Sequence, residues 1–255
     1  MDLQLHLTRL DKLAQTLRSP WLLRVLLSTH VVASAEHRRV LDCEIGTVVD
    51  IGANKGQFSL AARQWAPNSR VFAFEPLPDA ASTFRKVFQG DSRVTLYQVA
   101  IGPRAEEAAI HVSEADDSSS LLPISPLQIS LHPGTGEVRT ETVRVGRLSD
   151  YISASEIASP ALLKLDVQGY ELEALRGCED LLRKFDLVVV ECSFVELYEG
   201  QALAHEVTHF LQMNGFVLRN VYDLEYDPRG QAIQGDFLFG KTAPRKGVLD
   251  SDGSC

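Results

Sequence analysis

A glycine-rich turn at residues 50–56 constrains the fold of this chain more than any other feature. Its pattern, Asp50-x-Gly52-x-x-x-Gly56, follows the apolar run 47–51 and precedes an amphipathic stretch. Glycines let the backbone pass close to a ligand, and the first turn of a helix offers unpaired N–H groups to an anion. The pattern therefore predicts a strand, a tight turn and a helix, with a ligand bound at the turn.

Short apolar runs and amphipathic stretches keep alternating along the rest of the chain. Strands are predicted at 47–51, 71–74, 94–99, 162–165, 187–190, 216–221 and 236–239, with helices at 79–88, 170–184 and 202–213. Near-continuous apolar strands separated by helices are typical of a parallel sheet covered on both faces. We therefore expect one α/β domain over residues 47–241, followed by a loose tail at 242–255.

The middle of the chain departs from this alternation. Residues 109–112 and 138–145 are predicted to form the two strands of a β-hairpin, and the segment 113–137 between them is rich in Ser, Pro and Gly. Long connections of this kind are commonly functional or disordered. We expect a hairpin insertion with a flexible lid at 113–137.

The N-terminal residues 1–46 carry a different pattern. Leucines recur at helical spacing from Leu3 to Leu17, and Pro20 marks a break, so a helical cap is predicted there. These helices could cover the domain, pair two subunits as a homodimer, or rest on a membrane surface. The apolar run 21–35 is short and contains charge, so no transmembrane segment is expected.

Composition narrows the range of partners. The 255 residues are 45% hydrophobic and carry a formal net charge of -9, which suits a large core and shows no basic stripe for nucleic acid. The four cysteines are scattered, without the spacing of a zinc clip or a disulfide framework. This cysteine usage favours a reducing, cytoplasmic location.

An acidic residue after the second predicted strand indicates the class of ligand. Glu75 lies 19 residues after Gly56. A carboxylate there can accept both hydroxyls of a ribose, in the crevice where the strands of an open α/β sheet end. Asn54 stands where the dinucleotide fingerprint requires glycine, and no P-loop pattern occurs. A nucleoside-containing cofactor is therefore expected. A nucleotide (NAD)-dependent oxidoreductase and a tight turn without any ligand are the alternatives.

An ordered set of short motifs resembles the FkbM-type family of class I S-adenosylmethionine (AdoMet) methyltransferases. The set comprises VDIGANKGQFS at 49–59, FEP at 74–76, VAIG at 99–102, SSL at 119–121 and KLDVQGYE at 164–171. The resemblance covers about residues 47–240. It implies a Rossmann-like sheet, mostly parallel with its last strand antiparallel, and AdoMet-dependent O-methylation of a sugar, glycan or natural-product hydroxyl. Gln168 departs from the family, because many members carry Glu there. A non-catalytic cofactor-binding protein is a further alternative.

The family resemblance also implies which residues contact the cofactor. In the family the turn surrounds the methionine part of AdoMet, the acid after the second strand holds the ribose, and the adenine would lie beside Glu75-Pro76 and Ala100. The candidate cofactor-binding residues are Asp50, Gly52, Asn54, Gly56, Gln57, Phe58, Glu75, Pro76, Ala100 and Asp166.

Three charged residues near two neighbouring strand ends are the candidate catalytic group. Asp166 ends the fourth strand of the predicted parallel sheet, Lys164 shares its face two residues deeper, and Glu191 ends the next strand. A hydroxyl acceptor needs a base. Asp166 is therefore a candidate base, or an anchor for substrate or the cofactor amine, with its charge set by Lys164 and Glu191. A buried structural Lys–carboxylate pair is the alternative. Asp166 and Glu191 could also hold Mg²⁺, but the ligand set is incomplete, so no metal site is expected.

Two further polar patterns have weaker implications. Ser119 and Ser120 could close over the cofactor or the acceptor, or they could belong to a solvated loop. The pentapeptide 205–209, HEVTH, is a formal zinc-protease motif. At about 100° per residue, its two histidines fall on the helix face opposite the apolar residues, so they are predicted to point to solvent.

Overall fold

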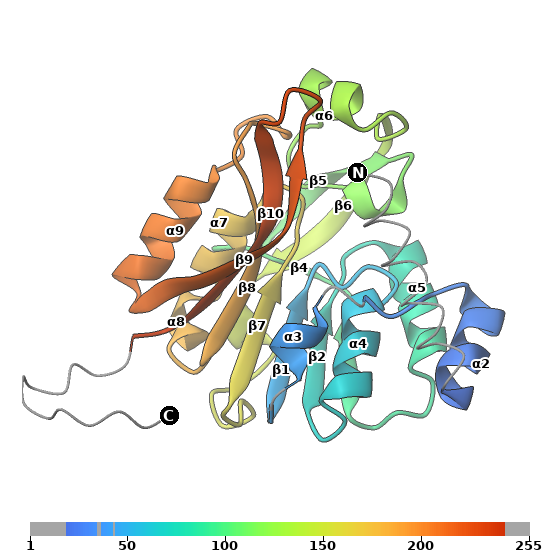
Figure 1. Ribbon diagram of the computed structural model, residues 1–255. Coiled ribbons are helices and arrows are strands. Elements are labelled where there is room, and N and C mark those ends of the chain that lie inside the picture. Colours follow the sequence, from blue (N-terminus) through green and yellow to red (C-terminus); the bar gives the residue numbers. More distant parts are fainter. Residues whose placement is uncertain (1–18, 35–36, 43, 243–255) are drawn as a thin grey trace, which may run out of the picture.

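A seven-stranded sheet forms the centre of the computed structural model, which describes residues 19–34, 37–42 and 44–242 (Figure 1). The strand order is β3-β2-β1-β7-β8-β10-β9. The last strand, β10, pairs antiparallel with both β8 and β9, and the other pairings of this sheet are parallel, which confirms the predicted mostly parallel sheet with an antiparallel last strand. The strands are β1 (Thr47–Ile51), β2 (Arg70–Phe74), β3 (Val94–Tyr97), β7 (Ala161–Leu165), β8 (Leu187–Ser193), β9 (Phe216–Tyr226) and β10 (Ala232–Lys241).

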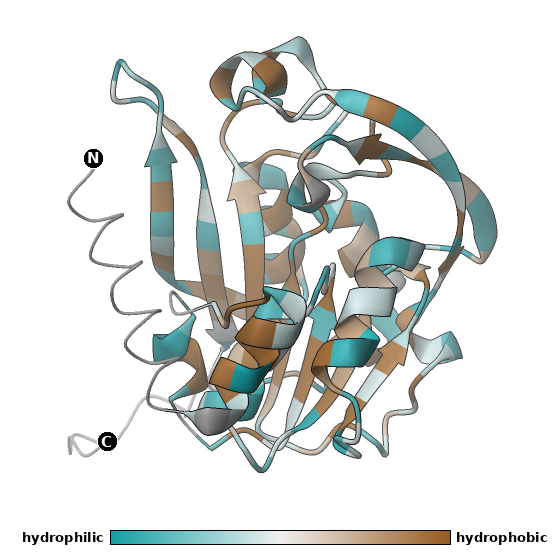
Figure 2. Cartoon of the chain, turned by 90° about the vertical axis from the view of Figure 1, so that its right-hand side faces the viewer, coloured by the Kyte–Doolittle hydropathy of each residue, from teal (hydrophilic) through white to brown (hydrophobic). Residues whose placement is uncertain are grey.

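Helices cover both faces of this sheet. One face carries α2 (Pro20–Thr29), α3 (Arg38–Leu41), α4 (Gln57–Trp65) and α5 (Pro78–Val87), and the other carries α7 (Glu171–Gly177), α8 (Glu179–Leu182) and α9 (Ala204–Met213). Successive residues of a strand enter opposite layers: Val48 packs in the first layer and Val49 in the second. On the α2 side, Figure 2 shows helices with both hydrophobic and hydrophilic residues, as expected for elements with one buried face.

The predicted helix 170–184 is two short helices. Cys178, which is buried, ends α7 and precedes α8. A Cβ atom on Gly177 would lie 2.4 Å from the carbonyl oxygen of Gly102, so α7 packs against the chain there more closely than any other residue type allows. The apolar periodicity continues through this break, which is why the sequence pattern predicted one helix.

A second sheet holds the predicted hairpin insertion. The strands β5 (Glu106–Ser113) and β6 (Glu137–Gly146) are antiparallel, and β6 also pairs with the short strand β4 (Ala100–Ile101). The predicted third strand, 94–99, is therefore β3 alone, and the chain passes from it into the second sheet.

The segment between β5 and β6 contains a helix that the sequence pattern did not indicate, α6 (Pro126–Leu131). The Ser125 hydroxyl accepts a hydrogen bond from the N–H of Gln128 at 3.2 Å and caps it. The Ser125 N–H donates to the carbonyl of Leu197 at 3.1 Å, which ties this segment to the loop after β8. A six-residue helix is too short to show an amphipathic repeat.

Of the predicted N-terminal cap, α2 and α3 are described. Pro20 stands in the first turn of α2, and Leu22 and Val25 are buried in the layer that contains α4 and α5. The leucine repeat from Leu3 to Leu17 and the tail beyond 242 lie outside the described residues. Among the described helices, none has the length and apolar character needed to cross a bilayer.

Candidate active site

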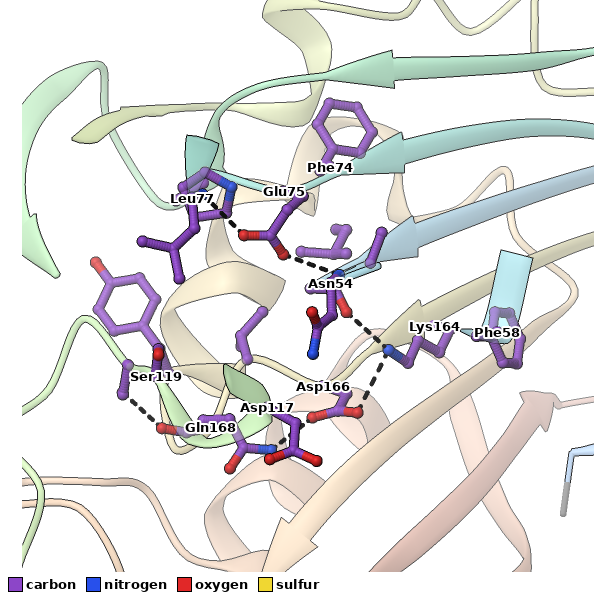
Figure 3. A pocket seen from close by; sticks show the side chains of 18 of the residues that line it. Asn54, Phe58, Phe74, Glu75, Leu77, Asp117, Ser119, Lys164, Asp166 and Gln168 are labelled. Atoms are coloured by element: carbon purple, nitrogen blue, oxygen red, sulfur yellow. Dashed lines mark hydrogen bonds and ion pairs between the residues drawn. The ribbon is translucent and has the colours of Figure 1, made fainter. Parts of the chain in front are cut away.

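A cavity of about 350 Å³ opens at the carboxyl ends of β1, β2 and β7. Its wall is built from the turn after β1, the end of β2, strand β4, the turn after β7, the β5–β6 insertion and the segment before α3. Figure 3 shows labelled side chains from the turn after β1, the end of β2, the insertion and the turn after β7 around it. Ligands of open α/β sheets bind in this position, outside the carboxyl ends of the strands. The cavity therefore lies where the sequence placed the site.

Most of the predicted site residues line this cavity, and three do not. Asp50 and Gly56 lie behind the turn, and Glu191 lies behind Gln168. The predicted residues in the wall are Gly52, Asn54, Gln57, Phe58, Glu75, Pro76, Ala100, Ser119, Ser120, Lys164 and Asp166.

The glycines of the turn are required by protein contacts. Gly52 has a φ of 76°, and a Cβ atom there would lie 1.8 Å from the carbonyl oxygen of Asp166. Gly56 has a φ of 99°, and its Cβ would lie 2.7 Å from the ring of Phe88. These two glycines let the turn pack against β7 and α5. The sequence pattern had predicted that these glycines let the backbone pass close to a ligand.

Asn54 occupies the turn between these glycines. It has a φ of 47°, which Asn tolerates better than most residues. Its side-chain Oδ1 is buried and has no hydrogen-bond partner, although the residue lines the cavity. A buried acceptor without a donor is costly, so this atom favours a ligand that donates a hydrogen bond.

Glu75, after β2, is held by two backbone N–H groups. Asn54 N donates to Oε2 at 2.9 Å, and Leu77 N donates to Oε1 at 2.8 Å (Figure 3). The residue is 6% exposed, and burial raises the pKa of its carboxyl to about 7 against the lowering effect of these N–H groups. Each oxygen has a lone pair left, because a carboxylate can accept about four hydrogen bonds.

A row of charged side chains crosses the sheet at the other end of the cavity. Lys164 on β7 is opposite Asp50 on β1, and its Nζ lies 3.3 Å from Asp50 Oδ1, 3.4 Å from Asp166 Oδ2 and 3.1 Å from the carbonyl oxygen of Gly52. Burial alone would lower the pKa of Lys164, but the charges of Asp166 and Asp50 outweigh it and raise the pKa above its usual range. Lys164 is therefore a fixed positive charge.

Gln168 joins two carboxylates behind this row. Its Nε2 donates to Asp166 Oδ1 at 2.8 Å and to Glu191 Oε2 at 3.1 Å, while its Oε1 accepts from the Tyr198 hydroxyl at 2.7 Å. Burial, followed by the charges of Asp166 and Asp236, raises the pKa of Glu191 well above its usual value. The residue at which the chain departs from the family motif thus connects the predicted catalytic carboxylates.

Of the two predicted serines, Ser120 fastens the insertion to the turn after β7, and Ser119 makes a contact within the insertion. The Ser120 hydroxyl donates to the carbonyl of Gln168 at 2.6 Å, and the Ser119 hydroxyl accepts from the N–H of Ser113 at 3.1 Å. Both residues lie in the cavity wall, so they keep this part of the insertion beside the site.

With this geometry in place, comparison with known proteins gives a family. Residues 50–218 match the Methyltransferase FkbM domain. The chain belongs to the FkbM methyltransferase family. The predicted function, an AdoMet-dependent methyltransferase, is confirmed at the level of the family.

Named relatives span most of this methyltransferase. It is 29% identical over 201 residues to the 2-O-methyltransferase NoeI of Sinorhizobium fredii, covering 76% of this chain and 79% of that one. It is 26% identical to the hexuronic acid methyltransferase AglP of Haloferax volcanii, covering 66% and 68%. Among solved structures, precorrin-6y C5,15-methyltransferase of Geobacter metallireducens covers 84% and 92%, with 14% identity and a TM-score of 0.46.

Sequence reasoning missed the cavity residues that precede the FkbM methyltransferase motifs. Val32, Ser34 and His37 line the cavity, and no repeat or motif singles them out. Gln168 could have been found, because it lies inside a quoted motif. His37 could not, because its partner Asp236 lies on β10, far along the chain.

The HEVTH motif of this methyltransferase lies away from the cavity. His205 and His209 are exposed on α9, as predicted, and the Glu206 carboxylate accepts a hydrogen bond from the N–H of Leu203 at 2.9 Å. Among the described residues, no group of three or more His, Cys, Asp or Glu side chains could hold a metal ion.

Proposed function

We propose that this FkbM-family methyltransferase binds AdoMet in the cavity and transfers its methyl group to a hydroxyl of a sugar, a glycan or a natural product. The observation that carries the proposal is Glu75. It is a buried carboxylate at the end of β2 with one backbone donor on each oxygen and room for one more. The names of two relatives, which refer to a 2-O position and to a hexuronic acid, support this class of acceptor.

The residues around Glu75 fit a nucleoside. The hydroxyls of a ribose would donate to the two free lone pairs of the carboxylate, and these donors would favour its ionised form. Pro76, Leu77, Ile101 and Leu121 give this end of the cavity apolar walls for a base. A volume of about 350 Å³ is at the lower end of the ~300–1,000 Å³ typical of ligand sites.

The residues around Asp166 fit the other half of the cofactor. Asp166 is 38% exposed on its side chain, and Asn54 offers the unpaired Oδ1. These acceptors suit the amine of the methionine part. The row of charged side chains holds two carboxylates against one lysine, and this negative balance suits a positive sulfonium. AdoMet supplies an electrophilic methyl group when it is bound. The chain's own contribution is to hold the acceptor oxygen in line with that group.

We assign Asp166 to anchoring. Both of its oxygens already accept contacts, from Lys164 and from Gln168. Lys164 then has the structural role of balancing Asp50 and Asp166, and Glu191 supports Gln168. Ser119 and Ser120 hold the insertion in place beside the acceptor.

Titration calorimetry with AdoMet and NAD is the first test. We expect AdoMet to bind and NAD not to bind, because Asn54 replaces the glycine that a pyrophosphate needs. Binding of NAD without AdoMet would contradict the proposal. Transfer of label from methyl-labelled AdoMet to a panel of oligosaccharides, with and without hexuronic acid units and with free or blocked 2-hydroxyls, then tests the acceptor class.

One variant and its matched control test the role of Asp166 in AdoMet binding. Asp166→Asn is expected to weaken AdoMet binding, and Glu107→Gln, on the exposed side of β5, is the matched control that leaves it unchanged. Pairing of two copies through the N-terminal helices and a cytoplasmic location stay predictions.

A further inference from the structure

A histidine and an aspartate from outside the matched family domain meet at the cavity wall. His37 Nε2 lies 3.1 Å from Asp236 Oδ2, and the two side chains are only 13% and 17% exposed. The His37 ring also packs edge-on against Phe58, with ring centroids 5.0 Å apart. Both His37 and Phe58 line the cavity, so the His37 ring faces the same space as Asp166 and Asn54.

The contacts of His37 fix which nitrogen carries the proton. A carboxylate only accepts hydrogen bonds, so Nε2, which faces Asp236, carries the hydrogen in the neutral ring. Nδ1 is then an acceptor, and it lies 3.2 Å from the Ser34 hydroxyl. Ser34 is buried in the cavity wall, and its N–H donates to the carbonyl of Gln57 at 3.2 Å, which holds it beside the turn after β1.

The other described titratable side chains of the cavity wall are less suited to take a proton. Glu75 lies at the nucleoside end, and Lys164 is held in its charged form. Asp166 already accepts from two donors. Burial and nearby carboxylates raise the pKa of Tyr170, so its hydroxyl stays protonated. Asp117 is exposed to solvent.

We infer that Ser34 and His37 form the route by which the acceptor hydroxyl loses its proton, with Asp236 as the positioning residue. This inference rests on the proposed function. As the acceptor oxygen bonds to the methyl carbon and the carbon–sulfur bond breaks, the acceptor proton passes to Ser34 Oγ, and the Ser34 proton passes to His37 Nδ1. The imidazolium is held by Asp236, and S-adenosylhomocysteine leaves as a neutral thioether.

The groups around Asp236 define the electrostatic setting of this route. On the sheet, Asp236 is opposite Glu191 of β8 and Tyr222 of β9. It also contributes to the charge that acts on Lys164, and Lys164 Nζ lies 5.7 Å from the Phe58 ring centroid. Arg38 follows His37 in the chain and is exposed. Among the described residues, Asp236 is a carboxylate in direct contact with the His37 ring.

Nitrogen-15 NMR of the full chain tests the arrangement without any acceptor. We expect long-range ¹H–¹⁵N spectra to show the neutral His37 ring with its hydrogen on Nε2, assigned by the signal lost in His37→Gln. In Asp236→Asn the protonation midpoint of His37 should shift to lower pH, because the carboxylate that stabilises the imidazolium is gone. A hydrogen on Nδ1, or an unchanged midpoint, would overturn the inference.

Kinetics with an oligosaccharide from the panel that the wild type methylates supplies the second test. We expect His37→Gln and Ser34→Ala each to lower kcat by roughly 100-fold, the range of general base catalysis, with AdoMet affinity within about twofold of the wild type. In the wild type, kcat is expected to rise with pH because the proposed route requires the neutral His37 ring. This rise should disappear in His37→Gln.

The matched control is His132→Gln. His132 Nε2 forms a similar contact with Glu225, 2.7 Å away, but lies outside the cavity wall. Its kcat and pH profile should be those of the wild type. An unchanged kcat in His37→Gln overturns the inference and leaves the proposed function intact. Absence of methyl transfer by the wild type contradicts the proposed function and, with it, the proton route.

Discussion

The two ends of the cavity are built in different ways. At the end proposed for the nucleoside, called the nucleoside end, Glu75 is held by backbone N–H groups of Asn54 and Leu77, which lie in the turns after the neighbouring strands β1 and β2. At the end proposed for the methionine part and the acceptor, called the methyl-transfer end, side chains make the contacts: Lys164 bridges Asp50 and Asp166. The first end depends on local backbone shape, whereas the second depends on charges that balance only when several strands are assembled.

This difference determines what a substitution does at each end. Removing a charge from the methyl-transfer end leaves another buried charge without its partner, so the free energy of unfolding is expected to fall. Removing Glu75 takes away an acceptor for the ligand, so the ligand is expected to bind more weakly. The free energy of unfolding is expected to fall less than at the methyl-transfer end. The following variants test that division, in order of decreasing effect.

Lys164→Met should cause the largest loss, about 3–5 kcal/mol of unfolding free energy, because Asp50 is 0% exposed and loses its counter-charge. Denaturant unfolding measures the loss. Adding Asp50→Asn to this variant should recover part of it, and Lys184→Met, at an exposed position, is the control. A Lys164→Met protein of wild-type stability would remove the proposed distinction between the two ends.

Gly52→Ala affects the turn where the two ends meet. It should cost at least about 2 kcal/mol more than Gly90→Ala. Both glycines have positive φ, 76° and 85°, but only the Gly52 Cβ would collide with the backbone of Asp166. Gly90 has nothing within 4 Å, so that variant isolates the cost of the left-handed conformation. Equal losses in the two variants would show that the turn can move away from β7.

Glu75→Gln tests the nucleoside end. AdoMet affinity should fall by about 30-fold, or about 2 kcal/mol. The free energy of unfolding should fall by about 1–3 kcal/mol, because the amide nitrogen cannot accept from one of the two backbone N–H groups. In the wild type, affinity should also fall as the pH decreases below about 7, because protonation of Glu75 removes an acceptor for the ribose hydroxyls. Calorimetry between pH 6 and 8 measures both effects on affinity. A pH dependence that persists in Glu75→Gln would assign it to another group.

Glu171→Gln should have the smallest effect of the four at pH 4, and its effect should grow as the pH rises. Burial raises the pKa of Glu171 to about 7, so the folded state keeps a proton that the unfolded state loses above its ordinary value of 4.5. Wild-type stability therefore falls relative to the variant by up to about 1.4 kcal/mol per pH unit across this window, and the difference is constant above it. Thermal unfolding from pH 4 to 8 measures it, and a difference that is already present at pH 4 would point to lost contacts with Val167 and Gly169 instead.

The nucleoside end and the sheet could be predicted from the sequence because their signals are local. The apolar runs place β1, β2 and β7, and Glu75 follows β2 at a recognisable distance from Gly56. The structure changed the meaning of Gly52 and Gly56, whose freedom serves contacts with β7 and α5. That contact could not be read from spacing, because it involves residues remote in sequence.

The methyl-transfer end was predicted only in part. Asp166, Lys164 and Glu191 were placed together, since the ends of neighbouring parallel strands meet. The bridging role of Gln168 and the cavity position of His37 were not predicted. Each depends on a side chain that comes from a distant segment: Tyr198 for Gln168, and Asp236 for His37.

The place of β10 in the sheet has a consequence for the order in which this protein can become active. During synthesis β9 emerges before β10, yet β10 lies between β8 and β9. The sheet therefore cannot be completed until the last strand has been made. Contacts between segments that are distant in sequence also form slowly. Asp236 arrives with that strand, whereas Glu75 and its backbone donors are synthesised long before. A nascent chain could therefore assemble its nucleoside end before Asp236 reaches His37, and on the proposed proton route the capacity for transfer would be the last property to mature.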